Sequence, residues 1–343
     1  MSDLTGIKVT DIPMNDQKVL SLFSSAKALG MDHDYTNAKT GALALPEFNT
    51  EFVRGVLEET NPKTFSDLVI ISGLTHGTGV WQGNADDLVK NRGISLQQVI
   101  GCRDDIMTYL ISKEIPSNIA FMIMEDVRKG RGLKSEYLEI MKAKKVPDYY
   151  IESCNKIKYM FPKGHAVAYV TMAVRVGYFK IYYPLEFYAT FFTVRSKQYD
   201  IKTMIRGKDA IISKIEELRT RQRVSNEKLS PKEQEQLKTL INALEMVQRG
   251  YKFSNIDLYK SDATRFVVDY DNKALIPPFI TIDGLGENNA ITVVEARKEC
   301  EFFSKEDLLR RTKLTQTNVQ DLADMGVLDN LSESDQLTLD LIF

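Results

Sequence analysis

Apolar residues recur at intervals of three or four from Glu51 to about Leu258, and this spacing constrains the fold more than any other feature of the sequence. Clear examples are AFMIMEDVRK, AVAYVTMAVRVGYFKIYY and IISKIEELRTRQR. An α-helix completes a turn in about 3.6 residues, so this interval places the apolar side chains on one face, where they can form a core. The sequence therefore predicts a mainly α-helical protein with short β elements.

Three segments differ from this pattern. Residues 1–50 alternate short apolar runs with turn formers, which predicts small helices and strands. Residues 207–248 are highly charged and predict a helical hairpin, in which Ser230 followed by Pro231 is typical of a helix start. The segment ATRFVVDYDNKALIPPF predicts two short strands joined through residues 269–272, because β-branched and aromatic residues flank a polar turn.

The residues after these strands predict a compact helical module. Gly284-Leu285-Gly286 leads into its first helix, the pattern of a helix-hairpin-helix DNA-binding element. In such an element glycines let helix N-termini expose N–H groups to a phosphate without basic side chains. An ordinary glycine turn is the alternative, and two glycines alone do not decide between them. The tail, residues 331–343, has nothing after it to pack on, and we expect it to be flexible.

Positive charge is concentrated in the middle of the sequence, although the formal net charge is only −2. Residues 128–180 contain twelve Lys and Arg residues and four acidic residues, whereas residues 281–343 contain six and thirteen. Local positive charge attracts the phosphates of nucleotides and nucleic acids. The central region is therefore the candidate phosphate-binding surface, and the C-terminal part cannot bind DNA through bulk charge.

Composition argues against several classes of protein. No window approaches the roughly 18 uninterrupted apolar residues of a membrane span, and MSDLTGIKVTD lacks the features of a signal peptide, so we expect a cytoplasmic protein without a membrane partner. Cys102, Cys154 and Cys300 have no CxxC spacing, which predicts reduced thiols and no zinc site. The acidic clusters lie in turns or helix starts and form no convincing Mg²⁺ pair. No GxSxG or paired Cys/His signature of nucleophilic catalysis is present.

The densest chemical signal is KIKYMFPKGHAVAY, residues 156–169. Lysines supply point charges for phosphate, a helix N-terminus offers backbone N–H groups, and an aromatic ring can cover a base or sugar. Lys163 and His165 stand at the predicted helix start, which makes them candidate phosphate contacts. The aromatic residues farther along this helix are more typical of core packing. This segment predicts a nucleotide site.

Two other places in the sequence are candidates for the same site. SGLTHGTG, residues 72–79, is rich in glycine and hydroxyl groups, which predicts a loop that faces a nucleotide; a plain loop is the alternative, since the Gly-Lys-Ser/Thr of a Walker loop is missing. Arg103 opens one predicted helix and Arg128 ends another. Either arginine can clamp a triphosphate.

Four stretches together point to a known family. They are KTGALALPEFNTEFVRGVLEET (39–60), ISGLTHGTGVWQGNA (71–85), IGCRDDIMTYL (100–110) and IKYMFPKGHAVAYVTMAVRVGYFK (157–180). The sequence closely resembles, nearly end to end, the C-terminal part of the PolC-type alpha subunit of bacterial DNA polymerase III. The resemblance implies that residues 1–50 are the end of the palm, residues 51–265 the fingers and residues 266–330 the helix-hairpin-helix duplex-binding module, followed by a clamp-binding tail at 331–343.

The resemblance also implies a division of labour. In this family a palm with three aspartates and two Mg²⁺ ions catalyses phosphoryl transfer, and those aspartates lie upstream of the part that this sequence resembles. The chain is then expected to bind dNTP and primer-template DNA alongside the remaining polymerase domains, without catalysing transfer by itself. The implied nucleotide contacts are Ser72, Gly73, His76, Arg103, Arg128, Lys163 and His165, and the implied DNA contacts are Lys129, Arg131, Lys156, Lys158, Gly284 and Gly286.

The tail departs from the family pattern. The clamp motif of the family resembles Gln-Leu-x-Leu-Phe, whereas here Gln336, Leu337 and Leu339 precede Asp340 and the aromatic residue is displaced to Phe343. An aspartate does not fill an apolar pocket, so binding to a sliding clamp requires the last residues to replace the missing ring. A polymerase fragment or split subunit is the leading interpretation. A stand-alone, non-catalytic DNA-binding protein and a helical interaction protein are the alternatives.

Overall fold

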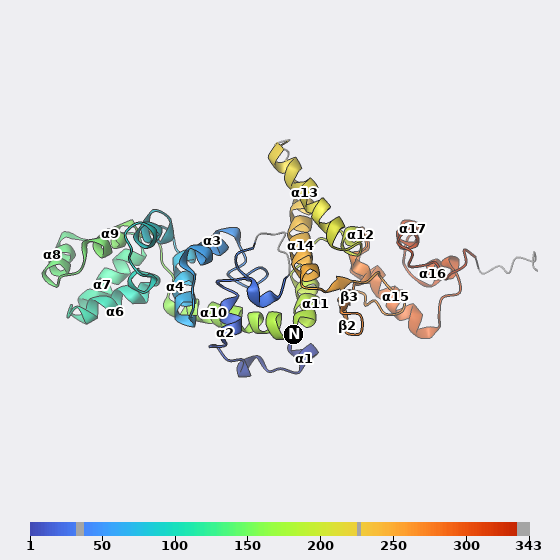
Figure 1. Ribbon diagram of the computed structural model, residues 1–343, viewed down its shortest axis with the longest axis horizontal. Helices are drawn as coiled ribbons and strands as arrows, with labels where there is room; N and C mark the ends of the chain where they lie inside the picture. Colours follow the sequence, from blue (N-terminus) through green and yellow to red (C-terminus); the bar gives the residue numbers. More distant parts are fainter. Residues whose placement is uncertain (32–37, 225–227, 335–343) are drawn as a thin grey trace, which may run out of the picture. The chain divides into compact units, whose positions relative to one another are not determined.

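The computed structural model describes residues 1–31, 38–224 and 228–334 (Figure 1). This part of the chain contains seventeen α-helices and one three-stranded sheet, which confirms the prediction of a mainly α-helical fold with short β elements. The predicted clamp motif, Gln336, Leu337, Leu339 and Phe343, lies outside the described residues.

The described residues divide into two compact units. The proximal unit comprises residues 8–29 and 38–181, and the distal unit comprises residues 1–7, 30–31 and 182–334. The α-helices of the proximal unit are α2 (Gln17–Ser21), α3 (Glu51–Thr60), α4 (Phe65–His76), α5 (Asp86–Lys90), α6 (Arg103–Ser112), α7 (Ser117–Arg128), α8 (Ser135–Ala143), α9 (Asp148–Lys156) and α10 (Lys163–Tyr182), whose last residue already belongs to the distal unit. Short 3₁₀ or π turns occur at Val9–Asp11, Lys27–Leu29, Trp81–Ala85 and Leu96–Gln98.

The elements of the distal unit follow α10 along the chain, except for the short α1 (Ser2–Thr5). They are α11 (Pro184–Val194), α12 (Ile201–Met204), α13 (Lys208–Val224), α14 (Pro231–Gln248), β1 (Lys252–Phe253), β2 (Val267–Asp269), β3 (Ala274–Ile276), a 3₁₀ turn at Phe279–Thr281, α15 (Glu287–Glu299), α16 (Lys305–Arg311) and α17 (Gln316–Asp324). Residues 1–31 and 38–50 contain short helical turns and no strand, so the small strands predicted there are absent from the described part.

Helix α10 runs through the core of the proximal unit and shows why the apolar period predicts helices. Ala166, Val170, Ala173, Val174 and further residues at the same spacing are buried along one face. Three- and four-residue steps bring these side chains into one stripe, and their burial removes apolar surface from water. The proximal core therefore positions the start of α10, which carries the predicted phosphate contacts.

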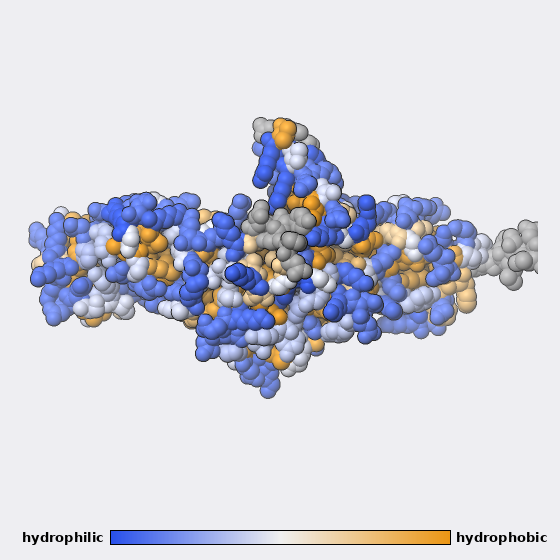
Figure 2. Space-filling model, in the orientation of Figure 1, coloured by the Kyte–Doolittle hydropathy of each residue, from blue (hydrophilic) through white to orange (hydrophobic). Residues whose placement is uncertain are grey.

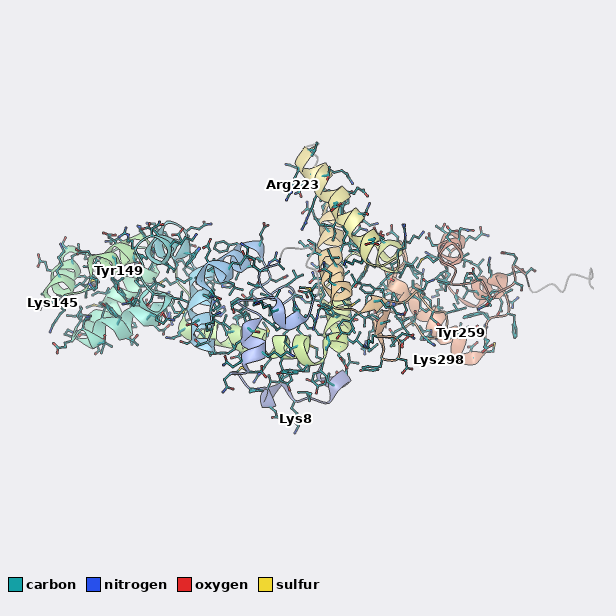
Figure 3. The ribbon with its side chains drawn as sticks, viewed as in Figure 1. Lys8, Lys145, Tyr149, Arg223, Tyr259 and Lys298 are labelled. Carbon is teal, nitrogen blue, oxygen red and sulfur yellow. The ribbon has the colours of Figure 1, made fainter. Side chains whose placement is uncertain are left out.

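The charged hairpin of the distal unit has the predicted form. Helices α13 and α14 are joined across residues 225–230, and Ser230 caps α14 by accepting the Glu233 N–H, with Pro231 at the first helical position. Hydrophilic residues cover much of α13 in Figure 2, and Arg223 lies near its end in Figure 3. The charged segment thus contains two helices, α13 and α14, with Ser230 at the start of the second.

The strands and the last three helices complete the distal unit. β2 pairs antiparallel with β3 across the predicted turn, and β1, which the sequence pattern did not reveal, pairs parallel with β3. Helices α15 to α17 enclose an apolar core that includes Phe279, Val293 and Leu308. The predicted helical module entered through a Gly-Leu-Gly turn is therefore present.

The cysteines and the helices also bear on the predicted class of protein. Cys102, Cys154 and Cys300 are free thiols, and burial raises the pKa of Cys102 and of Cys154 to about 12. Among the described residues, no helix is both long and apolar enough to cross a bilayer.

Candidate functional site

An extended segment between α9 and α10 pairs with the loop that follows α4. The Thr78 N–H donates to the Tyr159 carbonyl oxygen at 2.9 Å, and the Lys158 N–H donates to the Thr78 carbonyl oxygen at 2.9 Å. Gly79 has φ +69° and approaches this segment so closely that a Cβ would lie 2.4 Å from the Lys156 carbonyl oxygen. A glycine is therefore required at position 79. The pairing brings the end of α4 to the start of α10.

An aromatic cluster forms at this junction from Tyr159, Phe161, His165, Tyr169 and His76. The Phe161 ring stacks on His165 with centroids 4.9 Å apart and meets His76 edge-on at 6.3 Å. The ring centroids of His165 and Tyr169 are 4.4 Å apart, and those of Phe161 and Tyr159 are 5.3 Å apart. Two histidines that the sequence identified separately thus contact the same phenylalanine ring.

His76 is oriented through both nitrogens of its ring. Its Nε2 lies 2.6 Å from Oε2 of Glu47, and its Nδ1 lies 2.8 Å from the carbonyl oxygen of Ser72, one turn earlier in α4. A carbonyl oxygen only accepts, so Nδ1 donates to Ser72. The contact with Glu47 is an ion pair whenever the imidazole is protonated. These two contacts limit rotation of the ring next to Phe161.

A buried lysine binds the loop that contains Glu47. Lys180 is fully buried, and its Nζ donates to the carbonyl oxygens of Gly41 and Leu43 at 2.9 and 2.6 Å. Ala44 and Glu47 have φ of 62° and 66°, a conformation that non-glycine residues rarely adopt. Such strain costs roughly 1–3 kcal/mol at each residue and persists only where the surroundings fix it. The Lys180 contacts supply part of that constraint.

Lys163 occupies the first position of α10 and is bound by two carboxylates of α6. Asp105 Oδ1 accepts from Lys163 Nζ at 2.9 Å, and Asp104 Oδ2 accepts from the Lys163 backbone N–H at 2.7 Å. The hydrogen bond to Asp105 is the main reason why the pKa of Lys163 is raised. Two carboxylates therefore bind Lys163, the residue that was predicted to bind phosphate.

Arg103 belongs to the same arrangement. Its backbone N–H donates to the Phe161 carbonyl oxygen at 3.2 Å, which ties the start of α6 to the aromatic cluster. Its Nε is buried and makes no hydrogen bond within the described residues; the Asp104 carboxylate is 3.8 Å away. Arg103, Lys163, His165 and His76 are therefore all connected to the segment around Phe161.

The end of α7 carries basic residues whose charge is largely neutralised. Arg128 donates to both carboxylate oxygens of Glu125, and Lys129 Nζ lies 2.9 Å from the same carboxylate. The hydrogen bond from Arg128, followed by that from Lys129, lowers the pKa of Glu125 to about 2. Arg131 and Lys134 pair in the same way with Asp126, at 3.2 and 3.3 Å.

The positive excess counted along residues 128–180 therefore overstates the local field. The neutralising acids, Glu125, Asp126 and Asp105, precede the counted window in sequence and reach its basic residues in space. Lys156 and Lys158 differ from the paired residues, because neither forms an ion pair with any residue that the structure describes. Both side chains are exposed.

The sequence pattern predicted a loop at Ser72 and Gly73, but both residues lie in α4. Ser72 is buried, and a Cβ on Gly73 would lie 2.3 Å from the Gly101 carbonyl oxygen. The glycine is explained by close packing of α4 against the chain that leads into α6. The loop begins only at Gly77, after the helix has ended at His76.

The Gly284–Gly286 turn presents the start of α15. Gly284 has φ +75°, and Gly286 is the N-cap residue without a side-chain cap. A Cβ on either glycine would meet nothing within 4 Å, so the space beside this backbone is open. The neighbouring Asp283 is paired with Lys232 at 2.8 Å. An uncapped helix N-terminus with open space beside it suits a phosphate group.

No group of three or more His, Cys, Asp or Glu residues in the described ranges is arranged to hold a metal ion. Asp104 and Asp105, the neighbouring acids closest to the site, are engaged by Lys163. The described residues therefore do not fit the Mg²⁺ pair that the family resemblance implies for a palm.

Two parts of the chain match known domain families. Residues 2–145 match the bacterial DNA polymerase III alpha subunit finger domain, and residues 250–337 match a helix-hairpin-helix motif. These matches include α4, α6 and α7 in the first case and the Gly284–Gly286 turn in the second. The chain thus resembles a polymerase finger domain in its first part and a helix-hairpin-helix motif in its last part.

Relatives that match almost the whole of this chain are PolC-type polymerases. The chain is 50% identical over 339 residues to DNA polymerase III PolC-type of Oceanobacillus iheyensis, 52% to that of Halalkalibacterium halodurans and 50% to that of Bacillus subtilis. Each comparison covers 99% of this chain and 23% of the relative. The chain is therefore similar along almost its whole length to part of PolC-type DNA polymerase III, and it spans about a quarter of the length of these relatives.

Sequence reasoning missed several residues of the site. Phe161 lies between two predicted histidines, and Tyr169, which the pattern assigned to the core, contacts His165. Glu47 carried no signal, since an acid that is distant in sequence from His76 cannot be recognised as its partner. Asp105 was interpreted only as a helix-start residue. Phe161 could have been identified only from its position, close in sequence to Lys163 and His165.

Proposed function

We propose that this chain provides the nucleotide-holding and duplex-binding parts of a PolC-type DNA polymerase. The observation that carries the proposal is the junction of α4, α6 and α10, where the rings of His76 and His165 contact Phe161, the Arg103 N–H binds the Phe161 carbonyl oxygen, and Lys163 starts α10 two residues later. In this proposal residues 51–265 act as the fingers and residues 266–330 as the duplex-binding module, and the protein works in the cytoplasm.

The incoming dNTP replaces carboxylates as the partner of the basic groups. Lys163 and Arg103 neutralise the triphosphate once Asp104 and Asp105 release the start of α10, and His165 donates a hydrogen bond to the same group. Exchange of carboxylate for phosphate keeps the cations paired in both states, which limits the cost of desolvating them. Arg128 joins these contacts when it leaves Glu125.

Base and sugar lie against the His76 side of the cluster. Glu47 and the Ser72 carbonyl orient His76, while Gly73 lets α4 pack closely enough to bring it near Phe161. Fixed groups of this kind accelerate a reaction by holding the reactants in place rather than by taking part in bond making.

Primer-template DNA contacts two places in this proposal. The N–H groups at the start of α15, opened by Gly284 and Gly286, take one backbone phosphate, a contact that needs no basic side chain. Exposed Lys156 and Lys158 add ionic contacts, together with Lys129 and Arg131 after they leave their carboxylates.

Phosphoryl transfer itself belongs to a palm outside these residues. That palm supplies the three aspartates and holds Mg²⁺, which would stabilise the charge on the reacting phosphate. The chain by itself is then inactive, and its tail binds a sliding clamp only if Phe343 replaces the aromatic residue missing after Leu339.

A primer-extension assay tests the proposal. The chain is mixed with a fragment of the Bacillus subtilis relative that ends where this chain begins in the alignment, and synthesis is compared with that of each part alone. Mixing is expected to restore synthesis, and Lys163→Ala to reduce it at least tenfold, about 1.4 kcal/mol of transition-state stabilisation. Lys238→Ala is the control, because Lys238 is exposed and paired with Glu235 on α14.

The outcomes separate the candidate functions. Lack of synthesis on mixing, with salt-dependent DNA binding intact, supports a stand-alone DNA-binding protein. Loss of both activities supports a helical interaction protein. Equal synthesis by the Lys163→Ala and Lys238→Ala variants contradicts the role assigned to the start of α10.

A further inference from the structure

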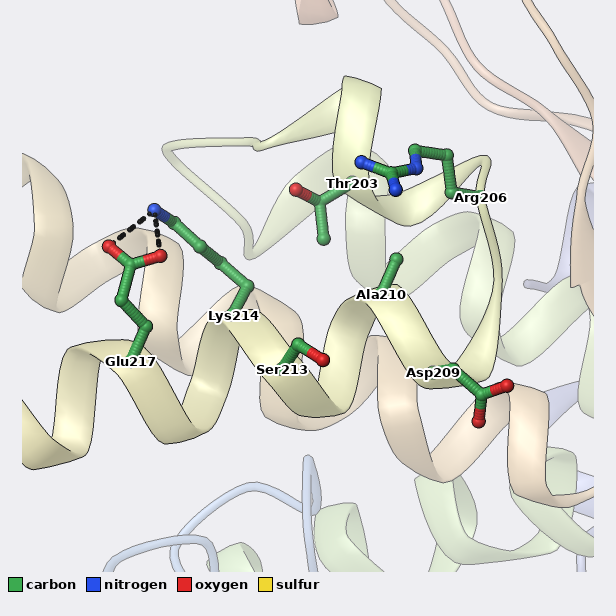
Figure 4. Close-up of a pocket in the computed structure, with 7 residues that line it drawn as sticks. All are labelled: Thr203, Arg206, Asp209, Ala210, Ser213, Lys214 and Glu217. Carbon is green, nitrogen blue, oxygen red and sulfur yellow. Dashed lines mark hydrogen bonds and ion pairs between the residues drawn. The ribbon is translucent and has the colours of Figure 1, made fainter.

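A polar hollow of about 450 Å³ opens beside α12 and the first half of α13 (Figure 4). It is lined by Thr203, Arg206, Asp209, Ala210, Ser213, Lys214 and Glu217, all in the distal unit. The hollow is separate from the residues to which nucleotide and duplex contacts are assigned above. Its ligand-binding groups are a guanidinium, an ammonium and two hydroxyls.

These groups are available to a ligand to different degrees. Arg206 is exposed, and within the described part of the chain neither its guanidinium nor the hydroxyls of Thr203 and Ser213 have a hydrogen-bond or ion-pair partner. Lys214 is paired with Glu217, through contacts of 2.9 and 2.8 Å to the two carboxylate oxygens. A pair this exposed contributes little stability, so an anion can compete with the carboxylate.

The chemistry of the hollow favours a phosphate group. A guanidinium offers a planar fork of donors that matches phosphate oxygens, and each hydroxyl adds one donor. The second acid, Asp209, turns away from Arg206 in Figure 4. The surrounding residues 195–224 contain nine Lys and Arg residues and four acidic residues. Acids outside this segment neutralise Lys202 and Arg221, whereas Arg206 forms no ion pair with any described residue.

The lining also indicates which kind of phosphate binds. None of the lining residues is aromatic, so the hollow offers no surface on which a base can stack. A nucleotide bound here would be recognised by its phosphate alone. Contacts of that kind are typical of the sugar-phosphate backbone, which proteins use to position a strand rather than to read it.

We propose that this hollow binds a phosphodiester group of a DNA strand. Arg206 and the hydroxyls of Thr203 and Ser213 donate to the phosphate oxygens, and Lys214 exchanges Glu217 for the phosphate. The site extends the DNA surface of the distal unit and rests on the proposed function in one respect, since it requires that the chain binds DNA.

Fluorescence anisotropy with labelled single-stranded and duplex DNA tests this site over a range of salt concentrations. Arg206→Ala is expected to weaken binding roughly fivefold, at the upper end of what one exposed ionic contact contributes. The slope of log affinity against log salt should fall by about 0.7 for single strands or about 0.9 for duplex, as expected for one lost phosphate contact. Lys214→Ala should act in the same direction.

Two further variants keep the test independent of folding. Glu217→Gln removes the competing carboxylate and is expected to strengthen binding about twofold, a gain that misfolding cannot produce. Lys238→Ala is the matched control, because Lys238 pairs with Glu235 three residues away, as Lys214 does with Glu217, but lies on α14 outside the hollow. Lys238→Ala should change the affinity for DNA much less than Arg206→Ala does.

Each outcome has a distinct meaning. If the wild type binds DNA and the Arg206→Ala and Lys238→Ala variants bind it with equal affinity, the hollow is not a DNA-binding site. The proposed function is unaffected by that result. Absence of DNA binding by the wild type overturns both. Finally, inorganic phosphate is tested by thermal shift: a shift that Arg206→Ala abolishes while DNA affinity stays unchanged assigns the site to free phosphate and overturns its assignment to a strand.

Discussion

Replacing Gly73 by alanine tests whether this glycine serves packing or a flexible loop. A Cβ at position 73 would lie 2.3 Å from the Gly101 carbonyl oxygen and 2.7 Å from Cys102 Sγ, so the backbone before α6 has to move. Overpacking of this kind costs typically about 1–3 kcal/mol. Alanine recovers up to about 1 kcal/mol of helix propensity. We therefore expect Gly73→Ala to lower the free energy of unfolding by about 1–2 kcal/mol.

Gly55→Ala is the matched control. Gly55 also lies inside a helix of the proximal unit, α3, but a Cβ there would meet nothing within 4 Å. Helix propensity alone then applies, and the variant should be about 0.5–1 kcal/mol more stable than the wild type. The two glycine substitutions are expected to have opposite signs.

Urea unfolding followed by tryptophan fluorescence measures both variants in the right place. Trp81 is the only tryptophan in the sequence, is 4% exposed and belongs to the proximal unit, so its signal reports on the unit that contains both glycines. With a slope of about 1–3 kcal/mol per molar urea, the two midpoints should differ by about 1 M. A Gly73→Ala midpoint equal to or above that of the wild type would refute the packing argument.

Two further predictions concern the charged groups of the proximal unit. Hydrogen bonds from Arg128 and then Lys129 lower the pKa of Glu125 from its ordinary 4.5 to about 2, so its stabilising contribution is complete above about pH 4.5 and disappears as the pH falls toward 2. Glu125→Gln should therefore be less stable than the wild type in urea at pH 7 and equal to it near pH 2; a gap that is the same at both values contradicts this. Lys180→Met leaves the carbonyl oxygens of Gly41 and Leu43 without this donor, at about 1–3 kcal/mol for each buried group, and an unchanged urea midpoint would argue against a stabilising role of these Lys180 contacts.

Local features of the structure were predictable because their causes are local. Ser230 and Pro231 start α14 through contacts with residues one turn away, and the Gly-Leu-Gly turn leads into α15 as expected. The strand β1 escaped prediction because two residues carry no period and form a strand only by pairing with β3.

The candidate site was predictable in part. Lys163 and His165 stand two residues apart, so their proximity to each other and to the start of a helix follows from the sequence. Which residues surround them in space does not follow from the sequence. Asp105 reaches Lys163 across 58 residues, and Glu47 reaches His76 from a separate loop.

The sequence by itself determined that this protein is helical, that the large helical region contains a charged hairpin and is followed by a glycine-led helical module, and that basic and aromatic groups gather around the start of α10. Only the tertiary structure decided which of those basic groups are neutralised, where Ser72 and Gly73 lie, and what orients His76. The physical reason is the range of the interactions. Helix periods and caps depend on neighbours within a turn or two, whereas ion pairs and close backbone packing depend on which distant segments the core brings together.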